Sequence, residues 1–298
     1  MSASSRRVRA GGVTLHAVED GAGPTVVLLH GFTGCAESMA GVAAGLRRGY
    51  RTLCIDLVGH GASDAPHDLS AYRMERCVDQ VADIVLALAG GPAHFLGYSM
   101  GGRVALALCA WRPELAASAL TIGARAGFAD ARERAARVRQ DEALADRIER
   151  EGVERFVDAW MALPLFASQR RLGAAALAEA RVQRLANRAH GLALSLRGMG
   201  AGAQPPLHDR LRRLPMPVCL VAGEEDPLFL GIARDLADRI PDARTEVVPA
   251  AGHAAHLENT EAFLRIAERF VAEACADSKP PQTTPEPLPA PTERTPAP

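Results

Sequence analysis

A serine flanked by glycines is the clearest indication of chemistry in this sequence. Residues 97–101 read Gly-Tyr-Ser-Met-Gly and directly follow the apolar run Ala93–Leu96, and a helix is expected to begin near Gly102. In that setting the pattern is typical of a nucleophile elbow, a sharp strand-to-helix turn that exposes a serine hydroxyl. Amides at the start of the next helix stabilise an anion that forms beside the hydroxyl. The pattern therefore predicts that Ser99 acts as a nucleophile or carries a proton.

An aspartate and a histidine follow this serine in the order that the same chemistry requires. Asp226 comes after the apolar segment Val218–Val221, and His253 comes after Thr245–Val248. Such an aspartate fixes the tautomer of the imidazole, which then accepts the serine proton. Taken singly, Asp226 could simply cap a helix and His253 could be a surface loop residue. Their combination with Ser99 favours a catalytic triad.

Length, composition and charge exclude several other classes of protein. The chain has 298 residues, of which 48% are hydrophobic, and this is enough for a large core. Its formal net charge of −1 argues against a nucleic-acid-binding surface as the main function. The six cysteines show no Cys-x-x-Cys spacing, so we interpret them as reduced core residues. Without a signal-peptide pattern or an apolar run of membrane-spanning length, we expect a cytoplasmic protein with no membrane insertion.

The elements that would position these residues alternate between strand and helix, which favours an α/β fold with a mainly parallel sheet. Strands are expected at Arg6–Arg9, Val13–Val18, Thr25–Leu29, Thr52–Ile55, Ala93–Leu96, Ala119–Ile122, Pro217–Val221 and Thr245–Val248. Helices between and after them are expected at Ser38–Leu46, Ala71–Leu88, Val104–Trp111 and Thr260–Ala274.

Between residues 125 and 204 the alternation stops, and only helical patterns are found. The expected segments are Asp130–Glu151, Val153–Leu163, Leu172–Leu185 and Gly191–Met199. We therefore predict an α/β-hydrolase core of residues 1–123 and 207–274, interrupted after the sixth strand by an all-helical cap of residues 124–206. One core with one cap fits better than two tandem domains. Residues 275–298 are rich in Pro, Thr, Glu and Ala and are predicted to be a disordered tail without a catalytic role.

Two further loops bear on catalysis. In this fold, the loop after the third strand and the residue after the nucleophile supply the amides of an oxyanion hole, which nominates Phe32 and Met100. His30 is interpreted as a loop-stabilising residue. His253 and His256 are spaced like a metal-ligand pair, but no carboxylate or cysteine completes a ligand set. We therefore expect no metal and no cofactor.

Several longer strings resemble a particular family. The sequence is similar to the 2-succinyl-6-hydroxy-2,4-cyclohexadiene-1-carboxylate synthases of menaquinone biosynthesis, from about Val13 to Ala274. The elbow and histidine strings occur in many α/β-hydrolases, whereas Ser-Leu-Arg-Gly-Met-Gly in the cap is more particular. The strings that carry the resemblance are residues 29–34, 96–103, 164–167, 191–200 and 251–259.

This resemblance implies a lyase that expels pyruvate from 2-succinyl-5-enolpyruvyl-6-hydroxy-3-cyclohexene-1-carboxylate, which carries three carboxylates. It implies that Arg103, Arg137 and Arg184 bind these carboxylates, because a guanidinium suits them. It also implies that Tyr98 and Trp160 line the pocket. Any one of the arginines could instead belong to a solvated helix face. The only partner expected is a small polycarboxylate substrate, and the oligomeric state is left open.

The implied mechanism uses the triad as a base. Asp226 would orient His253, and His253 would keep Ser99 basic enough to remove a ring proton. The amides of Phe32 and Met100 would stabilise the enolate, and no acyl-enzyme is required. The sequence departs from the family at residues 123–128, where relatives usually carry a Ser-Pro-Gly-Leu-like string.

Two other functions remain open from the sequence. A carboxylesterase or a carbon–carbon bond hydrolase of the same fold would use the same serine and histidine. A non-catalytic ligand-binding homologue would need neither. The arginines favour the synthase over an esterase, whose pocket is typically apolar. The complete triad argues against the non-catalytic protein.

Overall fold

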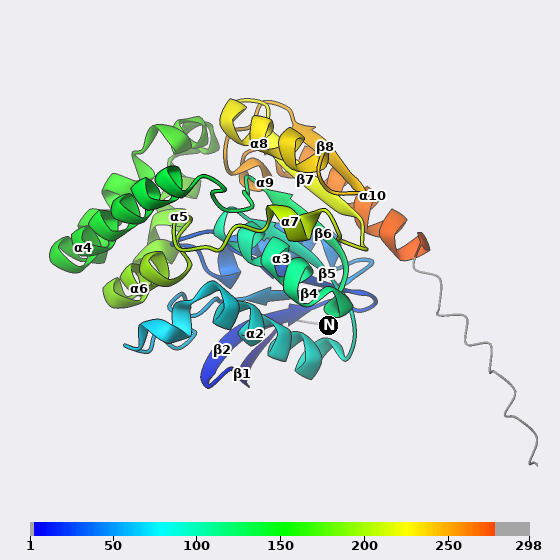
Figure 1. The fold of residues 1–298 in the computed structure, drawn as a ribbon, viewed down its shortest axis with the longest axis horizontal. Coiled ribbons are helices and arrows are strands. Elements are labelled where there is room, and N and C mark those ends of the chain that lie inside the picture. Colours follow the sequence, from blue (N-terminus) through cyan, green and yellow to red (C-terminus); the bar gives the residue numbers. More distant parts are fainter. Residues whose placement is uncertain (1–2, 278–298) are drawn as a thin grey trace, which may run out of the picture.

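The computed structural model describes residues 3–277, and its centre is an eight-stranded sheet (Figure 1). The strand order is β1-β2-β4-β3-β5-β6-β7-β8, with β1/β2 and β2/β4 antiparallel and every other pair parallel. The predicted mainly parallel sheet is thus confirmed. The strands are β1 Ser4–Ala10, β2 Val13–Asp20, β3 Thr25–Leu29, β4 Arg51–Ile55, β5 Ala93–Tyr98, β6 Ala116–Ile122, β7 Val218–Gly223 and β8 Ala243–Val248.

Helices cover both faces of the sheet, which is why its central strands are apolar almost throughout. In β3, Val26 and Leu28 join the core on one face, and Val27 and Leu29 join the core on the other. The first face is covered by α1 (Ala40–Leu46) and α10 (Thr260–Asp277). The second is covered by α2 (Met74–Ile84), α3 (Met100–Trp111) and α8 (Pro227–Ala237).

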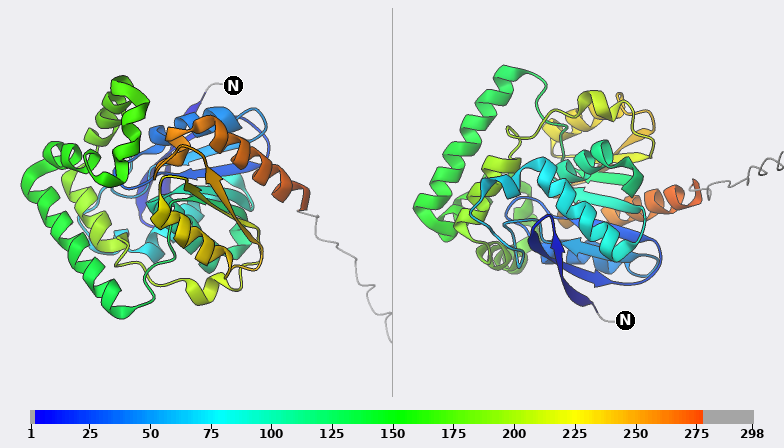
Figure 2. Two further views of the ribbon diagram at one scale, coloured as in Figure 1. Left: turned by 90° about the horizontal axis from the view of Figure 1, so that it is seen from above. Right: turned by 60° about the horizontal axis from the view of Figure 1, so that its bottom comes forward.

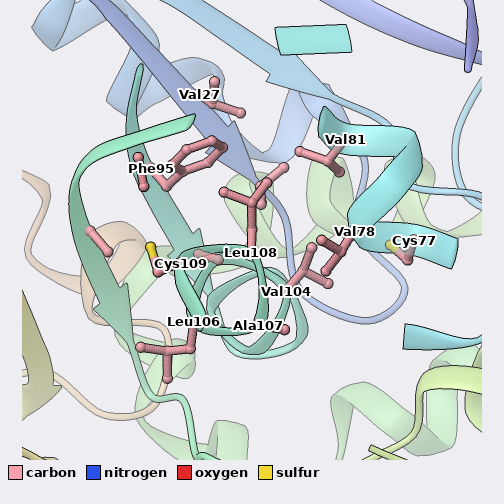
Figure 3. Close-up of a cluster of buried hydrophobic side chains, with 14 of the residues drawn as sticks. Val27, Cys77, Val78, Val81, Phe95, Val104, Leu106, Ala107, Leu108 and Cys109 are labelled. Atoms are coloured by element: carbon pink, nitrogen blue, oxygen red, sulfur yellow. The ribbon is translucent and has the colours of Figure 1, made fainter. Parts of the chain in front are cut away.

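The close-up in Figure 3 shows how tightly the second face is packed. Val78 of α2 and Val104 of α3 point toward one another, beside Val27 and Phe95 of the sheet. All four side chains are at most 1% exposed. This packing fixes α3, and therefore the residue that precedes it, against the sheet.

The cap lies to one side of the sheet and is helical throughout (Figures 1 and 2). It comprises α4 (Ala131–Met161), the 3₁₀ segment η5 (Pro164–Leu172), α5 (Gly173–Leu185) and α6 (Ala189–Met199). Gly152, with φ 78°, interrupts α4 where the sequence predicts a boundary between two helices. Ile148, Phe156 and Leu192 belong to a separate core inside the cap. The bounds of the cap as a distinct domain remain a prediction.

Short elements were not predicted separately because they lack a periodic pattern. Three of them have no predicted counterpart: α7 (His208–Leu211), α9 (Ala255–Glu258) and the 3₁₀ segment η4 (Pro113–Leu115). The 3₁₀ segments η1 (Ala36–Met39) and η2 (Leu69–Tyr72) and the π-helical segment η3 (Val85–Ala89) overlap the ends of the helices predicted at Ser38–Leu46 and Ala71–Leu88.

Several predicted boundaries were wrong, among them the start of α3 and the end of α10. Helix α3 begins at Met100 rather than near Gly102, because Ser99 with φ 50° already ends the strand. Helix α10 continues to Asp277, three residues past its predicted end at Ala274, so the tail does not begin at residue 275. Cys275 in this last turn lies with its Sγ atom 3.3 Å from Nε2 of His94. The remainder of the predicted tail, residues 278–298, lies outside the described residues.

Two further features of the chain are its helix lengths and its cysteines. Within residues 3–277, no helix is both long enough and apolar enough to cross a membrane. All six cysteines are free thiols, and four of them are buried, as the apolar surroundings of these residues in the sequence suggest.

Candidate active site

The turn at Ser99 explains why glycines must flank this serine. Ser99 has φ 50° and ψ −105°, a strained conformation for a residue with a side chain. A Cβ atom on Gly97 would lie 2.4 Å from the carbonyl oxygen of Gly101, and one on Gly101 would lie 2.2 Å from that of Leu29. The helix can therefore approach the strand only where both positions lack side chains.

We expect Gly101→Ala to lower the free energy of unfolding by about 3 kcal/mol, because the methyl group would be forced into the backbone of β3. Urea unfolding of the purified variant measures this. Gly41→Ala is the matched control: Gly41 lies in α1, and a Cβ there would meet nothing within 4 Å. Equal stability of the two variants would contradict the steric explanation.

A chain of hydrogen bonds connects the three predicted residues. His253 Nδ1 donates to Asp226 Oδ2 at 2.8 Å, which leaves Nε2 to accept from the Ser99 hydroxyl at 3.2 Å. The other carboxylate oxygen of Asp226 accepts the Phe229 amide at 3.2 Å and caps α8. The helix-cap and triad interpretations of Asp226 are therefore compatible, since each uses a different oxygen. Asp226 and His253 are only 6% and 3% exposed.

The strand order brings these residues together from distant parts of the chain. Ser99 follows β5, Asp226 follows β7 and His253 lies in the loop after β8. Strands β5, β6, β7 and β8 are successive parallel neighbours, so their carboxyl ends meet at one edge of the sheet. In open α/β sheets, ligands bind outside that edge.

The loop after β3 has the form that an oxyanion hole needs. Phe32 and Thr33 are the central residues of a turn that the Gly34 amide closes onto the Gly31 carbonyl at 3.0 Å. Met100 is the first residue of α3, so its amide has no carbonyl one turn earlier in the helix. The use of the Phe32 and Met100 amides in catalysis remains a prediction.

Two buried residues fix this loop from behind. His30 Nδ1 donates to the Gly31 carbonyl at 2.8 Å, and its Nε2 accepts the Leu57 amide at 3.0 Å. Burial lowers the pKa of His30, so the ring stays neutral and keeps both bonds. From the cap, Asn187 donates to the Thr33 carbonyl at 2.8 Å. The cap and the core loop are therefore directly linked.

Ser99 and His253 open into a cavity of about 410 Å³ under the cap. Most of the residues predicted to contact substrate line this cavity, and Arg184 does not. The lining includes Phe32, Tyr98, Met100, Arg103, Arg137 and Trp160.

Protein acceptors hold two arginines of the cavity, Arg103 and Arg137, in place. Arg103 Nη1 donates to the Met199 carbonyl at 2.7 Å and to Gln204 Oε1 at 3.0 Å. Burial lowers the pKa of Arg103 to about 10, against the raising effect of Asp141. Arg137 Nε donates to Asp141 Oδ1 at 2.7 Å. The Arg103 guanidinium therefore remains a cation at neutral pH, so the cavity suits an anion.

Comparisons with known proteins agree with this geometry. Residues 24–260 match the family model for the alpha/beta hydrolase fold. A Bacillus subtilis (strain 168) protein provisionally named 2-succinyl-6-hydroxy-2,4-cyclohexadiene-1-carboxylate synthase is 38% identical, over 84% of this chain and 91% of that protein. A synthase of the same name from Enterobacter sp. (strain 638) is 32% identical, over 80% of this chain and 88% of that enzyme.

Comparison with solved structures also finds proteins of this fold. The structure of MenH from S. aureus superposes with a TM-score of 0.83 at 28% identity, covering 88% of this chain and 98% of that one. The chain belongs to the 2-succinyl-6-hydroxy-2,4-cyclohexadiene-1-carboxylate synthase family. A thermophilic esterase from Thermogutta terrifontis superposes with a TM-score of 0.79 at 24% identity, over 90% of this chain and 99% of that one, which shows the shared fold alone.

Within this synthase fold, Arg184 lies in a second cavity, of about 250 Å³. Phe32 and Tyr98 line both cavities and therefore form the wall between them. Arg184 Nη1 donates to the Ala180 carbonyl at 2.8 Å, and its buried Nε has no hydrogen-bond partner among residues 3–277. The structure thus does not bring Arg184 together with Arg103 and Arg137. Its binding of a carboxylate remains a prediction.

Aromatic rings surround the candidate triad. The ring of Trp160 lies 5.3 Å from that of Phe32, and the ring of Phe229 lies 4.6 Å from that of His253. Tyr98 lies 5.4 Å from His253, and burial raises the pKa of its phenol, so the hydroxyl stays protonated. The rings of Phe229 and Tyr98 thus cover much of the imidazole surface outside the cavity.

His256 takes no part in a metal site among the described residues. Its ring lies 4.5 Å from that of Tyr98, and burial lowers its pKa to about 3, so it is neutral. In residues 3–277 no group of three His, Cys, Asp or Glu side chains is placed to hold a metal ion.

Several residues of this synthase site were not predicted from the sequence. Asp141, Gln204 and Asn187 position predicted residues or loops, and Arg125 and Ser195 line the cavity. Gln204 lies 101 residues from Arg103 in the sequence. No local pattern marks Gln204 or Asn187, because only the tertiary fold brings them to their partners, whereas Asp141 lies four residues after Arg137 on α4, a spacing that is visible in the sequence.

The same three residue types also form a chain outside the site. Ser5 Oγ lies 2.9 Å from His16 Nε2, and His16 Nδ1 lies 2.8 Å from Asp56 Oδ2. Ser5 is exposed on β1, in no strained turn, and none of the three lines the 410 Å³ cavity. Residue types and hydrogen bonds alone therefore do not define an active site in this fold.

Proposed function

We propose that this protein eliminates pyruvate from 2-succinyl-5-enolpyruvyl-6-hydroxy-3-cyclohexene-1-carboxylate to form 2-succinyl-6-hydroxy-2,4-cyclohexadiene-1-carboxylate, a step in menaquinone biosynthesis. The observation that carries the proposal is that Arg103 and Arg137 line the same cavity as Ser99 and His253. A base and two guanidinium groups under an aromatic lid suit a substrate with several carboxylates.

The names of substrate and product define the bonds that change. A 3-ene becomes a 2,4-diene, so a proton leaves C2 and the enolpyruvyl oxygen leaves C5. The C2 proton is acidic because it lies next to the succinyl ketone. Removal of this proton gives an enolate, whose electrons then move through the ring to expel enolpyruvate. Protonation of the enolpyruvate carbon yields pyruvate.

Each group of the site has a role in this reaction. His253 accepts a proton through Ser99, and Asp226 stabilises the resulting imidazolium. The amides of Phe32 and Met100 donate to the enolate oxygen as its charge grows. Arg103 and Arg137 hold carboxylates and so fix the C2 proton near Ser99. No covalent intermediate is required.

A coupled assay tests the proposal. We expect the purified protein to release pyruvate and form the diene chromophore at equal rates from the enolpyruvyl cyclohexene. Lactate dehydrogenase reports pyruvate, and ultraviolet absorbance reports the diene. Cleavage of simple esters without release of pyruvate would instead assign the protein to the hydrolases of this fold.

We expect Arg103→Met to raise KM by about tenfold to a hundredfold, because a charge-assisted bond to a carboxylate is lost. The variant also leaves the Met199 carbonyl without this donor, so the free energy of unfolding should fall by about 1–3 kcal/mol. Steady-state kinetics and urea unfolding measure the two effects. Arg139→Met, an exposed arginine of α4, is the control. An unchanged KM for Arg103→Met would remove Arg103 from the binding site.

A further inference from the structure

The loop after β6 lies at the centre of the site and has no role so far. Strand β6 pairs with β5 on one side and with β7 on the other (Figure 1). The loop that follows it therefore lies between the loops that carry Ser99 and Asp226. A Cβ atom on Gly123 would lie 2.7 Å from Cε1 of His253, so this loop begins in contact with the imidazole.

Two residues further on, Arg125 reaches the cavity that Ser99, Arg103 and Arg137 line. Its guanidinium carbon lies 3.9 Å from the centre of the Phe128 ring. Stacking of this kind occupies the face of the guanidinium and leaves its N–H donors free in the plane. The Phe128 ring thus holds the group in one orientation without using its hydrogen bonds.

Arg125 also differs from the other two arginines in its partners. Arg103 and Arg137 each donate to protein acceptors. Within residues 3–277, the side chain of Arg125 has no hydrogen bond and no ion pair. Glu133 lines an adjoining outer cleft of about 520 Å³ together with Arg125, without forming an ion pair with it. A half-buried guanidinium without an acceptor is therefore placed at the boundary between the cavity and the outer cleft.

The charges of the cavity favour an anionic ligand at this position. Burial lowers the pKa of both Arg103 and Arg125, and the neighbouring Arg137 cation lowers each of them further, because like charges repel. Asp141 is the only carboxylate, within the described part of the chain, that pairs with any of the three. A ligand with several carboxylates would relieve this repulsion.

We propose that Arg125, held by Phe128, is a third guanidinium contact for a carboxylate of the substrate and selects polycarboxylates over simpler acids. This inference rests on the proposed function, because it assigns a residue to the same substrate. Arg125 is here a binding and specificity residue, since it takes no part in moving the proton.

Kinetics of matched variants test this assignment. We expect Arg125→Gln to raise KM by about tenfold or more and to leave kcat within about threefold, because the contact serves binding rather than proton transfer. Arg125→Lys should recover part of the loss, since it restores the charge without the fork. Arg132→Gln removes one positive charge from an exposed position at the start of α4 and should change neither constant.

A binding measurement separates this inference from the proposed function. Calorimetry measures the Kd of the substrate for Ser99→Ala protein and for the Ser99→Ala, Arg125→Gln double variant. We expect Arg125→Gln to raise this Kd by about the same factor as it raises KM. Values of KM and Kd within twofold of the parent would overturn the role of Arg125, even if pyruvate is released normally. If the wild type releases no pyruvate, the proposed function fails. Calorimetry with tricarballylate, a plain tricarboxylate, then still compares wild type with Arg125→Gln, and equal affinities would again overturn the assignment.

Discussion

Ser99→Ala is expected to lower kcat for pyruvate release by roughly a thousandfold, because the variant lacks the hydroxyl that carries the proton from substrate to His253. The structure gives a geometric reason: the Ser99 hydroxyl lies 3.2 Å from Nε2 of an imidazole that Asp226 orients. The fold should be unaffected, since an alanine adopts the backbone of the elbow no less easily than a serine. Stopped-flow absorbance of the diene, combined with the pyruvate assay, measures the loss.

Ser5→Ala is a matched control for this experiment. It removes a hydroxyl that also lies within hydrogen-bond distance of a histidine, at 2.9 Å, but outside the cavity. We expect full activity from it. Substantial pyruvate release by Ser99→Ala would show that His253 reaches the substrate without the serine. Loss of activity in Ser5→Ala would show that the assay reports general damage to the protein.

Asp226→Asn is expected to lower kcat by about a thousandfold to ten-thousandfold while leaving stability nearly unchanged. The two carboxylate oxygens of Asp226 have separate partners, the His253 ring and the Phe229 amide. Asparagine keeps an oxygen for the Phe229 amide and so remains a good helix cap. Its amide nitrogen would donate to His253 Nδ1, and the ring would then carry its proton on Nε2. In that tautomer the ring cannot accept a proton from Ser99.

Asp226→Ala distinguishes the two roles. It removes the cap as well, so it should lose about 1 kcal/mol of unfolding free energy in addition to activity. Urea unfolding of both variants measures the helix-cap role of Asp226, and steady-state kinetics of both variants measures its catalytic role. An Asp226→Asn enzyme with near-normal turnover would show that Asp226 serves as a helix cap and does not orient the histidine.

The sequence predicted the elements of this fold well because each has a local cause. Apolar runs marked the buried strands, and helical spacing marked the longer helices of core and cap. The mainly parallel sheet followed from their alternation. Boundaries were less accurate: α3 begins at Met100 because a strained serine replaces the usual helix cap, and α10 continues to Asp277.

The sequence predicted those residues of the candidate site that lie in a loop directly after a predicted strand. Ser99, Asp226 and His253 each follow a strand, and parallel strands deliver such residues to one edge of the sheet. By contrast, the carboxylate-binding roles of Arg103, Arg137 and Arg184 were implied by family resemblance, and only Arg103 has a local reason as well, since it lies one helical turn after Ser99. The structure places the first two in one cavity and the third behind Tyr98 in another.

The amino-acid sequence by itself therefore determined the strand-to-helix turn, the order of the candidate triad residues and the run of helices between β6 and β7. These features depend on interactions between residues close in the chain. Only the tertiary structure decided which cations share a cavity with Ser99 and which acceptors hold Arg103. It also placed Arg125, without an acceptor of its own, beside them. Such contacts join segments up to about a hundred residues apart, as between Arg103 and Gln204, so no local pattern encodes them.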